Sequence, residues 1–181
     1  MENIVPQTTG DMLSRARNPS DPAALAFSGV IGNSLERGRR PLVRGLSEAR
    51  FQRLINEYFH DLELSNGADM PSPAGDEFAD LLALLLESRA APDERRAWLA
   101  HAIASATMGE NHLWQDMGLP ARKLLTQLMR ENFPALAAKN TGDMKWKKFF
   151  YRQICERAEV PICKAPHCAE CCDYGECFGG D

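Results

Sequence analysis

Cysteines are concentrated at the carboxyl end of this chain. Five of the six lie within the last nineteen residues, and four of them have the spacing C-x4-C-x2-C-x5-C: Cys163, Cys168, Cys171 and Cys177. Thiolate sulfur is a soft ligand that suits zinc and iron–sulfur clusters, and ligands from one short loop converge without long-range pairing of chain segments. The spacing therefore predicts a metal or cluster site in this tail.

The first part of the pattern, C-x4-C-x2-C, matches the run found in plant-type ferredoxins. In those proteins the fourth ligand is remote in sequence, whereas Cys177 follows closely here. Pro161, Pro166 and Gly175 are among the residues that let the backbone curl. An iron–sulfur cluster with one distinct corner is the favoured prediction.

Two alternatives stay open for the tail. Structural zinc sites more often join two C-x2-C knuckles, or a cysteine pair and a histidine pair, across a longer spacer, and this loop lacks that layout. The least favoured interpretation is that these thiols bind no metal or form adventitious disulfides. Five cysteines in fifteen residues would make a cytoplasmic protein prone to unwanted oxidation.

Two further cysteines fall outside the four-ligand pattern. Cys172 competes with Cys171 by adjacency, so the spacing leaves open which of the two binds. Cys155 lies eight residues before Cys163, on a predicted helix, and is interpreted as a small buried hydrophobic residue rather than a ligand.

Histidine and tryptophan residues offer weaker signals. His167 precedes Cys168 and is a candidate ligand or hydrogen-bond donor to cluster sulfur, while His112 is a weaker candidate because a lone histidine is usually structural or exposed. Trp114 and Trp146 are interpreted as scaffold, since an indole at helical spacing most often packs in a core.

Composition excludes several classes of function. The net charge of -4 argues against nucleic acid as the main partner, because phosphate binding needs a clustered positive field. The longest apolar run, Leu81 to Leu86, is far below the roughly 20 residues that span a bilayer, and the first ten residues lack a signal-peptide pattern. We therefore expect a cytoplasmic protein without membrane contact.

Motifs of common catalytic sites are absent from the sequence. There is no nucleophile elbow, phosphate-binding loop or dinucleotide fingerprint, and Asp76, Asp80 and Glu87 have spacings that an ordinary wet surface explains. The sequence predicts a metal carrier or an interaction protein rather than an enzyme.

The apolar residues before the cysteine tail recur with helical periodicity. No stretch alternates with a period of two, so the sequence predicts an all-α domain over residues 20–158, after a flexible lead-in at 1–19 and before a cysteine-rich cluster-binding tail at 159–181. The run of leucines from Phe78 to Leu86 predicts a helix buried on several sides at the centre of the fold. Other helices are expected in the following segments: after Ser20-Asp21-Pro22, from Ser47, from Pro92 to Gly109, and from Pro120 to Phe133.

A last helix is predicted from Met144 to about Glu156, with Asp143 as its capping residue. Its apolar side chains share one side, and a basic stripe formed by Lys145, Lys148 and Arg152 shares the other. Such a stripe is most simply an ordinary solvated face.

Three segments of the chain resemble the NifQ family, whose members handle molybdenum during assembly of the iron–molybdenum cofactor of nitrogenase. They are His112-Leu-Trp-Gln-Asp-Met-Gly-Leu119, Asn140 with Asp143-Met-Lys-Trp-Lys-Lys-Phe-Phe-Tyr-Arg-Gln153, and Cys163 to Gly179 with its ending Asp-Tyr-Gly-Glu-Cys-Phe-Gly. The C-x4-C-x2-C-x5-C spacing is the signature of that family, and the resemblance is diffuse over residues 20–111.

The resemblance implies a function and partners. Cys163, Cys168, Cys171 and Cys177 would hold an iron–sulfur cluster of the 3Fe-4S type that also carries molybdenum. The protein would receive molybdate or another molybdenum source and would donate the metal to the nitrogenase cofactor scaffold, with the nitrogenase iron protein taking part. Because molybdenum arrives as an oxyanion, the basic stripe, with Lys147 and Lys164 nearby, would attract it.

Two alternatives from other classes remain. One is an interaction protein whose tail is a structural zinc module, and the other is a simple iron–sulfur electron-transfer protein that never holds molybdenum.

Overall fold

The computed structural model describes residues 6, 8–68, 77–159 and 175 of the chain. Within these residues the secondary structure is helical, with no strand beyond an isolated bridge between Ala16 and Phe59, so the predicted all-α class is confirmed. The cysteine tail predicted at 159–181 lies outside the described residues except for its first residue and Gly175. The helices are α1 (Thr9–Ser14), α2 (Pro22–Glu36), α3 (Glu48–Tyr58), α4 (Phe78–Glu87), α5 (Glu94–Thr107), α6 (Leu113–Asp116), α7 (Arg122–Asn132), α8 (Pro134–Ala137) and α9 (Trp146–Arg157).

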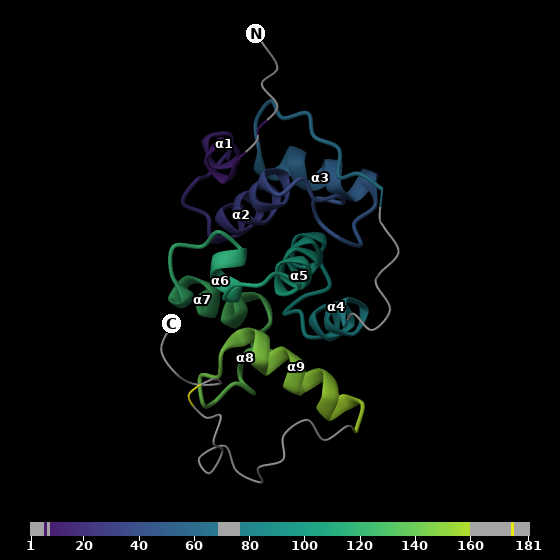
Figure 1. Ribbon diagram of the computed structural model, residues 1–181, viewed down its shortest axis with the longest axis vertical. Coiled ribbons are helices and arrows are strands. Elements are labelled where there is room, and N and C mark those ends of the chain that lie inside the picture. Colours follow the sequence, from purple (N-terminus) through teal and green to yellow (C-terminus); the bar gives the residue numbers. More distant parts are fainter. Residues whose placement is uncertain (1–5, 7, 69–76, 160–174, 176–181) are drawn as a thin grey trace.

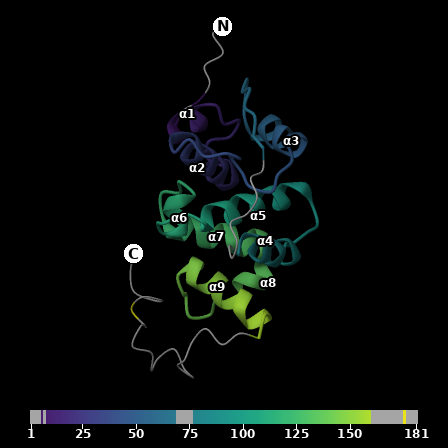
Figure 2. The same ribbon diagram turned by 45° about the vertical axis from the view of Figure 1, so that its right-hand side comes forward.

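The helices follow one another along the long axis of the molecule. Helices α1, α2 and α3 lie at one end, α4 to α7 lie in the middle, and α8 and α9 lie at the other end (Figure 1). A view turned by 45° keeps this order (Figure 2). The amino-terminal helices are therefore far from α9. Helix α5 packs against α2 and α4, and α4 packs against α9, so these contacts connect the two ends.

Residues 9–14 fall inside the segment 1–19 that the sequence predicts as a flexible lead-in. They form α1 instead, with a capping box between Thr8 and Asp11, and α1 packs against α2. Its Met12 is completely buried in the hydrophobic core. The packed part of the chain thus begins before residue 20, and a six-residue helix carries too little periodicity to be recognised in the sequence.

Helix α5, rather than α4, is the most enclosed element. Most of its side chains are buried, including Trp98, His101 and Ile103, and its alanines allow α2, α4 and α6 to approach it. Helix α4 buries one face and exposes Asp80 and Ala83, and it lies to one side of α5 in both views (Figures 1 and 2). The prediction that the leucine run forms the centre of the fold is therefore wrong.

Capping explains where several helices begin. Asp21 accepts a hydrogen bond from the amide of Ala23 at the start of α2, and Asp93 accepts one from the amide of Arg96 at the start of α5. Both starts agree with the sequence. The Asp143 cap predicted for the last helix is wrong: α9 begins at Trp146 after Lys145, and Asp143 has a left-handed backbone with φ of 52°.

Helix α9 uses its apolar face as the sequence predicts. Trp146, Phe149, Phe150, Gln153 and Ile154 are all buried, and the three aromatic rings lie with their centroids 5.7 to 6.1 Å apart. This cluster fixes how α9 rotates about its axis. The charged side chains of its first turn are therefore directed to the surface or towards α6.

In the described part of the chain, no helix combines the length and the apolar character needed to cross a lipid bilayer.

Candidate functional site

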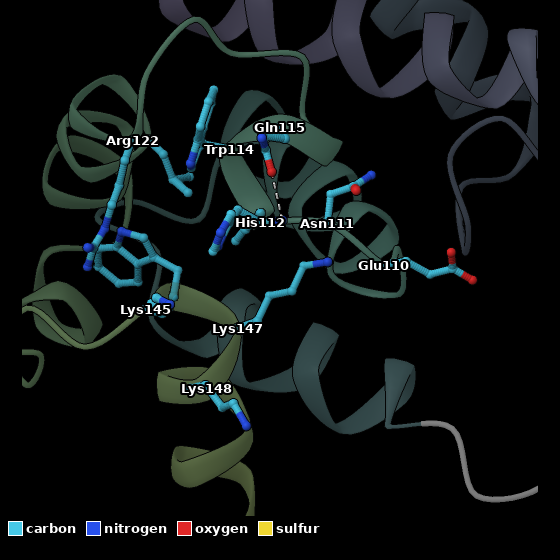
Figure 3. A pocket seen from close by; sticks show the side chains of 12 residues that line it. Glu110, Asn111, His112, Trp114, Gln115, Arg122, Lys145, Lys147 and Lys148 are labelled. Atoms are coloured by element: carbon cyan, nitrogen blue, oxygen red, sulfur yellow. Dashed lines mark hydrogen bonds between the residues drawn. The ribbon is translucent and has the colours of Figure 1, made fainter. Parts of the chain in front are cut away.

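A cavity of about 410 Å³ opens between α6, α7 and the first turn of α9 (Figure 3). The residues that line it come from three stretches of chain that are separated in sequence. They are Glu110, Asn111, His112, Leu113, Trp114, Gln115, Arg122, Leu125, Lys145, Trp146, Lys147 and Lys148. Among the described residues that line it, basic side chains predominate and Glu110 is the one carboxylate.

The α6 side of the cavity is formed around His112, which directly precedes the helix. Its backbone N–H donates to Oε1 of Gln115 over 3.1 Å, and this bond orients the first turn (Figure 3). Leu113 is buried beneath the cavity, and Trp114 is half-buried against the hydrophobic core. His112 is thereby placed at the cavity wall.

The α9 side of the cavity is held by a loop that Asn140 organises. The Asn140 side chain accepts a hydrogen bond from the amide of Met144 over 2.8 Å and donates one to the carbonyl of the same residue over 2.9 Å. Helix α9 then begins without a side-chain cap and without an acidic residue in its first turn. This loop delivers Lys145 and Lys148 to the cavity.

A nearly buried ion pair joins the two sides. Nζ of Lys147 lies 2.6 Å from Oδ2 of Asp116 and 2.8 Å from the carbonyl oxygen of Gly109. The Asp116 side chain is 4% exposed and also accepts two hydrogen bonds from Asn111, each of 3.0 Å. Asp116 therefore connects α6, α9 and the loop between α5 and α6 into one unit.

Arg122, at the start of α7, closes the cavity from a third direction. Its guanidinium donates to Oδ1 of Asp143 over 3.1 Å and to the carbonyl oxygen of the same residue over 2.5 Å. The pairing explains why Asp143 does not cap α9: its carboxylate is engaged by α7. Arg122 is a site residue that the sequence did not indicate, because it lies more than twenty residues from Lys145.

The basic stripe predicted on the last helix is divided by the structure. Lys145 and Lys148 line the cavity beside α6, and within the described residues neither makes a salt bridge. Arg152 lines a separate hollow of about 550 Å³ with Asn140, and its Nε donates to Oε1 of Glu156 over 2.7 Å. The three cations therefore do not face one site.

Other residues singled out in the sequence have structural surroundings. Trp146 is buried and its indole N–H donates to Oγ1 of Thr126 over 3.2 Å, which fits a scaffold role. Cys155 is a half-buried free thiol on α9. Glu87 forms an ion pair with Arg157, as expected of a surface carboxylate.

The predicted cluster ligands lie outside the described residues. These are Cys163, Cys168, Cys171 and Cys177, together with Cys172 and His167. Among the residues that the structure does describe, no group of three or more His, Cys, Asp or Glu side chains is arranged to hold a metal ion. The ligand assignment stays a prediction from the spacing.

Two of the three segments that carry the family resemblance meet at the cavity. Residues 112–119 supply its α6 side, and residues 143–153 supply its α9 side. The residues between them in sequence form α7 and α8. The resemblance is therefore concentrated in space as well as in sequence.

Comparison with known proteins gives consistent results. The NifQ family model matches residues 26–179. Protein NifQ of Azotobacter vinelandii is 36% identical over 155 residues, covering 78% of this chain and 80% of that protein. Protein NifQ of Rhodobacter capsulatus is 38% identical over 138 residues (76% of each chain), and that of Klebsiella pneumoniae is 36% identical over 159 residues (78% of this chain and 89% of that protein).

No solved structure matches the chain significantly. The family match extends from α2 to the last cysteine, and the relatives align over about three quarters of the chain. These matches confirm the resemblance seen in the sequence, and the chain belongs to the NifQ family.

Proposed function

We propose that this chain binds an iron–sulfur cluster through its tail cysteines and carries molybdenum for assembly of the iron–molybdenum cofactor of nitrogenase. Membership of the NifQ family supports a role in nitrogen fixation and in biosynthesis of that cofactor. The observation that carries the finer proposal is the C-x4-C-x2-C-x5-C spacing, which lies inside the range matched to the family.

The donor set fits the proposed cluster. Four thiolates within fifteen residues are soft ligands of the kind that hold iron and sulfide. When bound, a three-iron cluster offers sulfide donors at an open corner, and these suit a reduced molybdenum centre. Cys163, Cys168 and Cys171 would hold the iron. Cys177 would bind the metal at the open corner or release it.

Molybdenum is the cargo in this proposal rather than a resident cofactor. The chain would receive molybdate or another molybdenum source and pass the metal to the nitrogenase cofactor scaffold, with the nitrogenase iron protein taking part. We class the protein as a carrier and donor rather than an enzyme, because the sequence contains no motif for turnover of an organic substrate.

Metal analysis of protein purified without oxygen tests the proposal. Wild-type chain should contain iron and acid-labile sulfide and should retain molybdenum after desalting. Cys163→Ser and Cys168→Ser should each lose most of the iron and the molybdenum, because a thiolate ligand is missing. The matched control is Cys155→Ser, which removes a thiol from α9 and should keep both metals.

Other outcomes identify other functions. Stoichiometric zinc without iron would contradict the carrier and favour a structural zinc module. Iron and sulfide without molybdenum would favour a simple electron-transfer protein. Cys172→Ser, measured in the same way, determines whether Cys172 or Cys171 is the ligand.

A growth experiment separates molybdenum delivery from electron transfer. A nitrogen-fixing host that lacks this chain should grow poorly on dinitrogen when molybdate is scarce. Abundant molybdate should restore growth, because excess metal bypasses a delivery factor. A growth defect that persists at high molybdate would contradict the proposed role.

A further inference from the structure

Positive charge is concentrated at the cavity between α6 and α9. Its lining includes three lysines, one arginine and one histidine, whereas the whole chain has a net charge of -4. In the part of the chain that the structure describes, Glu110 is the only carboxylate that lines it, and in Figure 3 this exposed side chain points away from the other labelled residues. The cavity is therefore a local basic site on an acidic protein.

Two of the cations are already engaged by protein groups. Lys147 is neutralised by Asp116, and Arg122 is engaged by Asp143. Within the described residues, Lys145 and Lys148 make no salt bridge, and they lie on the α9 side of the cavity (Figure 3). The uncompensated charge of the cavity thus comes from these two lysines.

The engaged cations keep the cavity in shape. The pair of Lys147 with Asp116 connects the first turn of α9 to α6, and the pair of Arg122 with Asp143 connects the loop before α9 to α7. Buried Trp146 anchors the same turn in the core. Because Lys145 flanks this turn and Lys148 lies within it, their backbones need little rearrangement on binding, and a preformed site has a smaller entropy cost.

We propose that this cavity binds a small tetrahedral oxyanion through Lys145 and Lys148. The choice of molybdate as the physiological anion rests on the function proposed above, whereas the chemistry of the site requires only a compact dianion. A volume of about 410 Å³ equals that of roughly fourteen waters, at about 30 Å³ each, so the anion enters with part of its hydration shell.

The type of cation predicts how selective this site is. Lysine ammonium groups are strongly hydrated point charges, without the planar fork by which arginine recognises oxygen pairs. Binding should therefore depend on charge more than on shape. Tungstate and sulfate should compete with molybdate, and added salt should weaken all three because partly exposed charges are screened.

Equilibrium dialysis of the full-length chain against molybdate at low ionic strength tests the site. Lys145→Gln/Lys148→Gln should weaken exchangeable molybdate binding by at least about tenfold, since one lysine within about 4 Å of an anion in water contributes roughly fivefold per unit charge. The matched control is Lys123→Gln/Lys139→Gln, which removes two exposed lysines from outside this cavity. That control should change affinity less than about twofold, because distant surface charges are screened.

Arg152→Gln distinguishes the cavity from the basic stripe predicted in the sequence. Arg152 lines the other hollow, so its replacement should leave molybdate binding unchanged. The proposal is overturned if wild-type protein shows no saturable molybdate binding or if the two double variants lose affinity equally. It is also overturned if Arg152→Gln binds molybdate as weakly as Lys145→Gln/Lys148→Gln.

Circular dichroism checks that each variant is folded. If the double variant misfolds, Lys148→Glu replaces one exposed side chain and tests the same charge. Iron, sulfide and desalting-resistant molybdenum are measured on the same samples. Saturable molybdate binding by protein that contains no iron would support the cavity site and contradict the proposed cluster. Iron, sulfide and molybdenum in the wild type, together with unchanged molybdate binding in the lysine variant, would support the cluster and contradict the cavity site.

Discussion

Asp116 shows how one residue organises the candidate site. Its nearly buried carboxylate receives Lys147 from α9 and Asn111 from the loop before α6, and Nη2 of Arg37 lies 4.0 Å away at the end of α2. A carboxylate in such surroundings has its charge balanced by the lysine. Removal of the charge leaves that lysine without a counterion in a poorly solvated position.

Asp116→Asn should lower the free energy of unfolding by about 3 kcal/mol, because breaking a buried ion pair leaves one charge uncompensated. Denaturant titration followed by circular dichroism measures the change. Glu87→Gln is the matched control, since it breaks the exposed pair with Arg157 and should cost less than about 1 kcal/mol. Equal losses in the two variants would show that Asp116 has no special structural role.

Tyr58 gives the folded protein a dependence on alkaline pH. Burial, with a smaller contribution from Asp21, raises the pKa of its phenol from 10.0 to about 12. Between these pH values the unfolded chain releases the phenolic proton while the folded chain retains it. Stability should therefore fall as pH rises through this window, by roughly 2 kcal/mol.

Tyr58→Phe should make the stability of the protein less sensitive to pH between 10 and 12. The free energy of unfolding is measured at several pH values from 8 upward for wild type and variant. Below pH 10 the difference between the two should stay constant, because the phenol is protonated in both states. Parallel curves over the whole range would contradict the raised pKa.

Helix α2 approaches the turn after α6 so closely that only glycine fits between them. A Cβ atom on Gly29 would lie 2.0 Å from the carbonyl oxygen of Met117 and 2.6 Å from Cα of Gly118. This contact positions α6, and therefore the cavity, relative to the amino-terminal helices. A side chain here must push the two elements apart.

Gly29→Ala should lower the free energy of unfolding by at least about 2 kcal/mol, because the clash involves backbone atoms that cannot rotate away. The control is Gly10→Ala in α1, where the nearest atom would be an ordinary 3.7 Å away. That change should be neutral or slightly stabilising, by up to about 1 kcal/mol. Thermal unfolding compares the two, and a neutral Gly29→Ala would refute the close packing.

Helix periodicity and capping account for most elements predicted from the sequence. Helices α2, α3, α5, α7 and α9 fall where apolar spacing, proline and capping residues place them. The two main differences have separate causes. Helix α1 is too short to show a period in the sequence, and the burial of α4 and α5 depends on the elements that pack against them. The small alanine side chains of α5 let other helices pack on several of its sides. The bulky leucines of α4 are buried on one face of that helix.

At the scale of the whole molecule, the described residues form one continuous hydrophobic core. It extends from Met12 on α1 to Ile154 on α9 and is continuous through the central helices. A core of this size stabilises the fold by burial of apolar surface, whereas a small metal-dependent domain needs the free energy of metal binding to fold. We therefore expect the proposed cluster to confer function rather than stability.

Simultaneous replacement of Cys163, Cys168, Cys171 and Cys177 by serine should leave the helical domain folded. The far-ultraviolet circular dichroism spectrum should stay helical, and thermal unfolding should stay cooperative, because the described residues form a core that is continuous from α1 to α9. Loss of helicity in this variant would show that the metal site supports the fold, as in a zinc-stabilised module.

The sequence by itself determined the local features of this protein. The cysteine spacing from Cys163 to Cys177 and the apolar period of α9 can be read directly, because both depend on residues a few positions apart. The NifQ motifs are local in the same sense. These features were enough to predict the helical class and the family.

Only the tertiary structure decided which cations share a cavity. Lys148 and Arg152 are one helical turn apart in sequence yet line different hollows, whereas Arg122 and Lys145 are far apart in sequence and line the same cavity. Those relations depend on how the aromatic face of α9 seats against the core and on the pair that Lys147 forms with Asp116. Long-range packing of this kind leaves no periodic trace in the sequence, because each contact joins residues whose spacing along the chain is arbitrary.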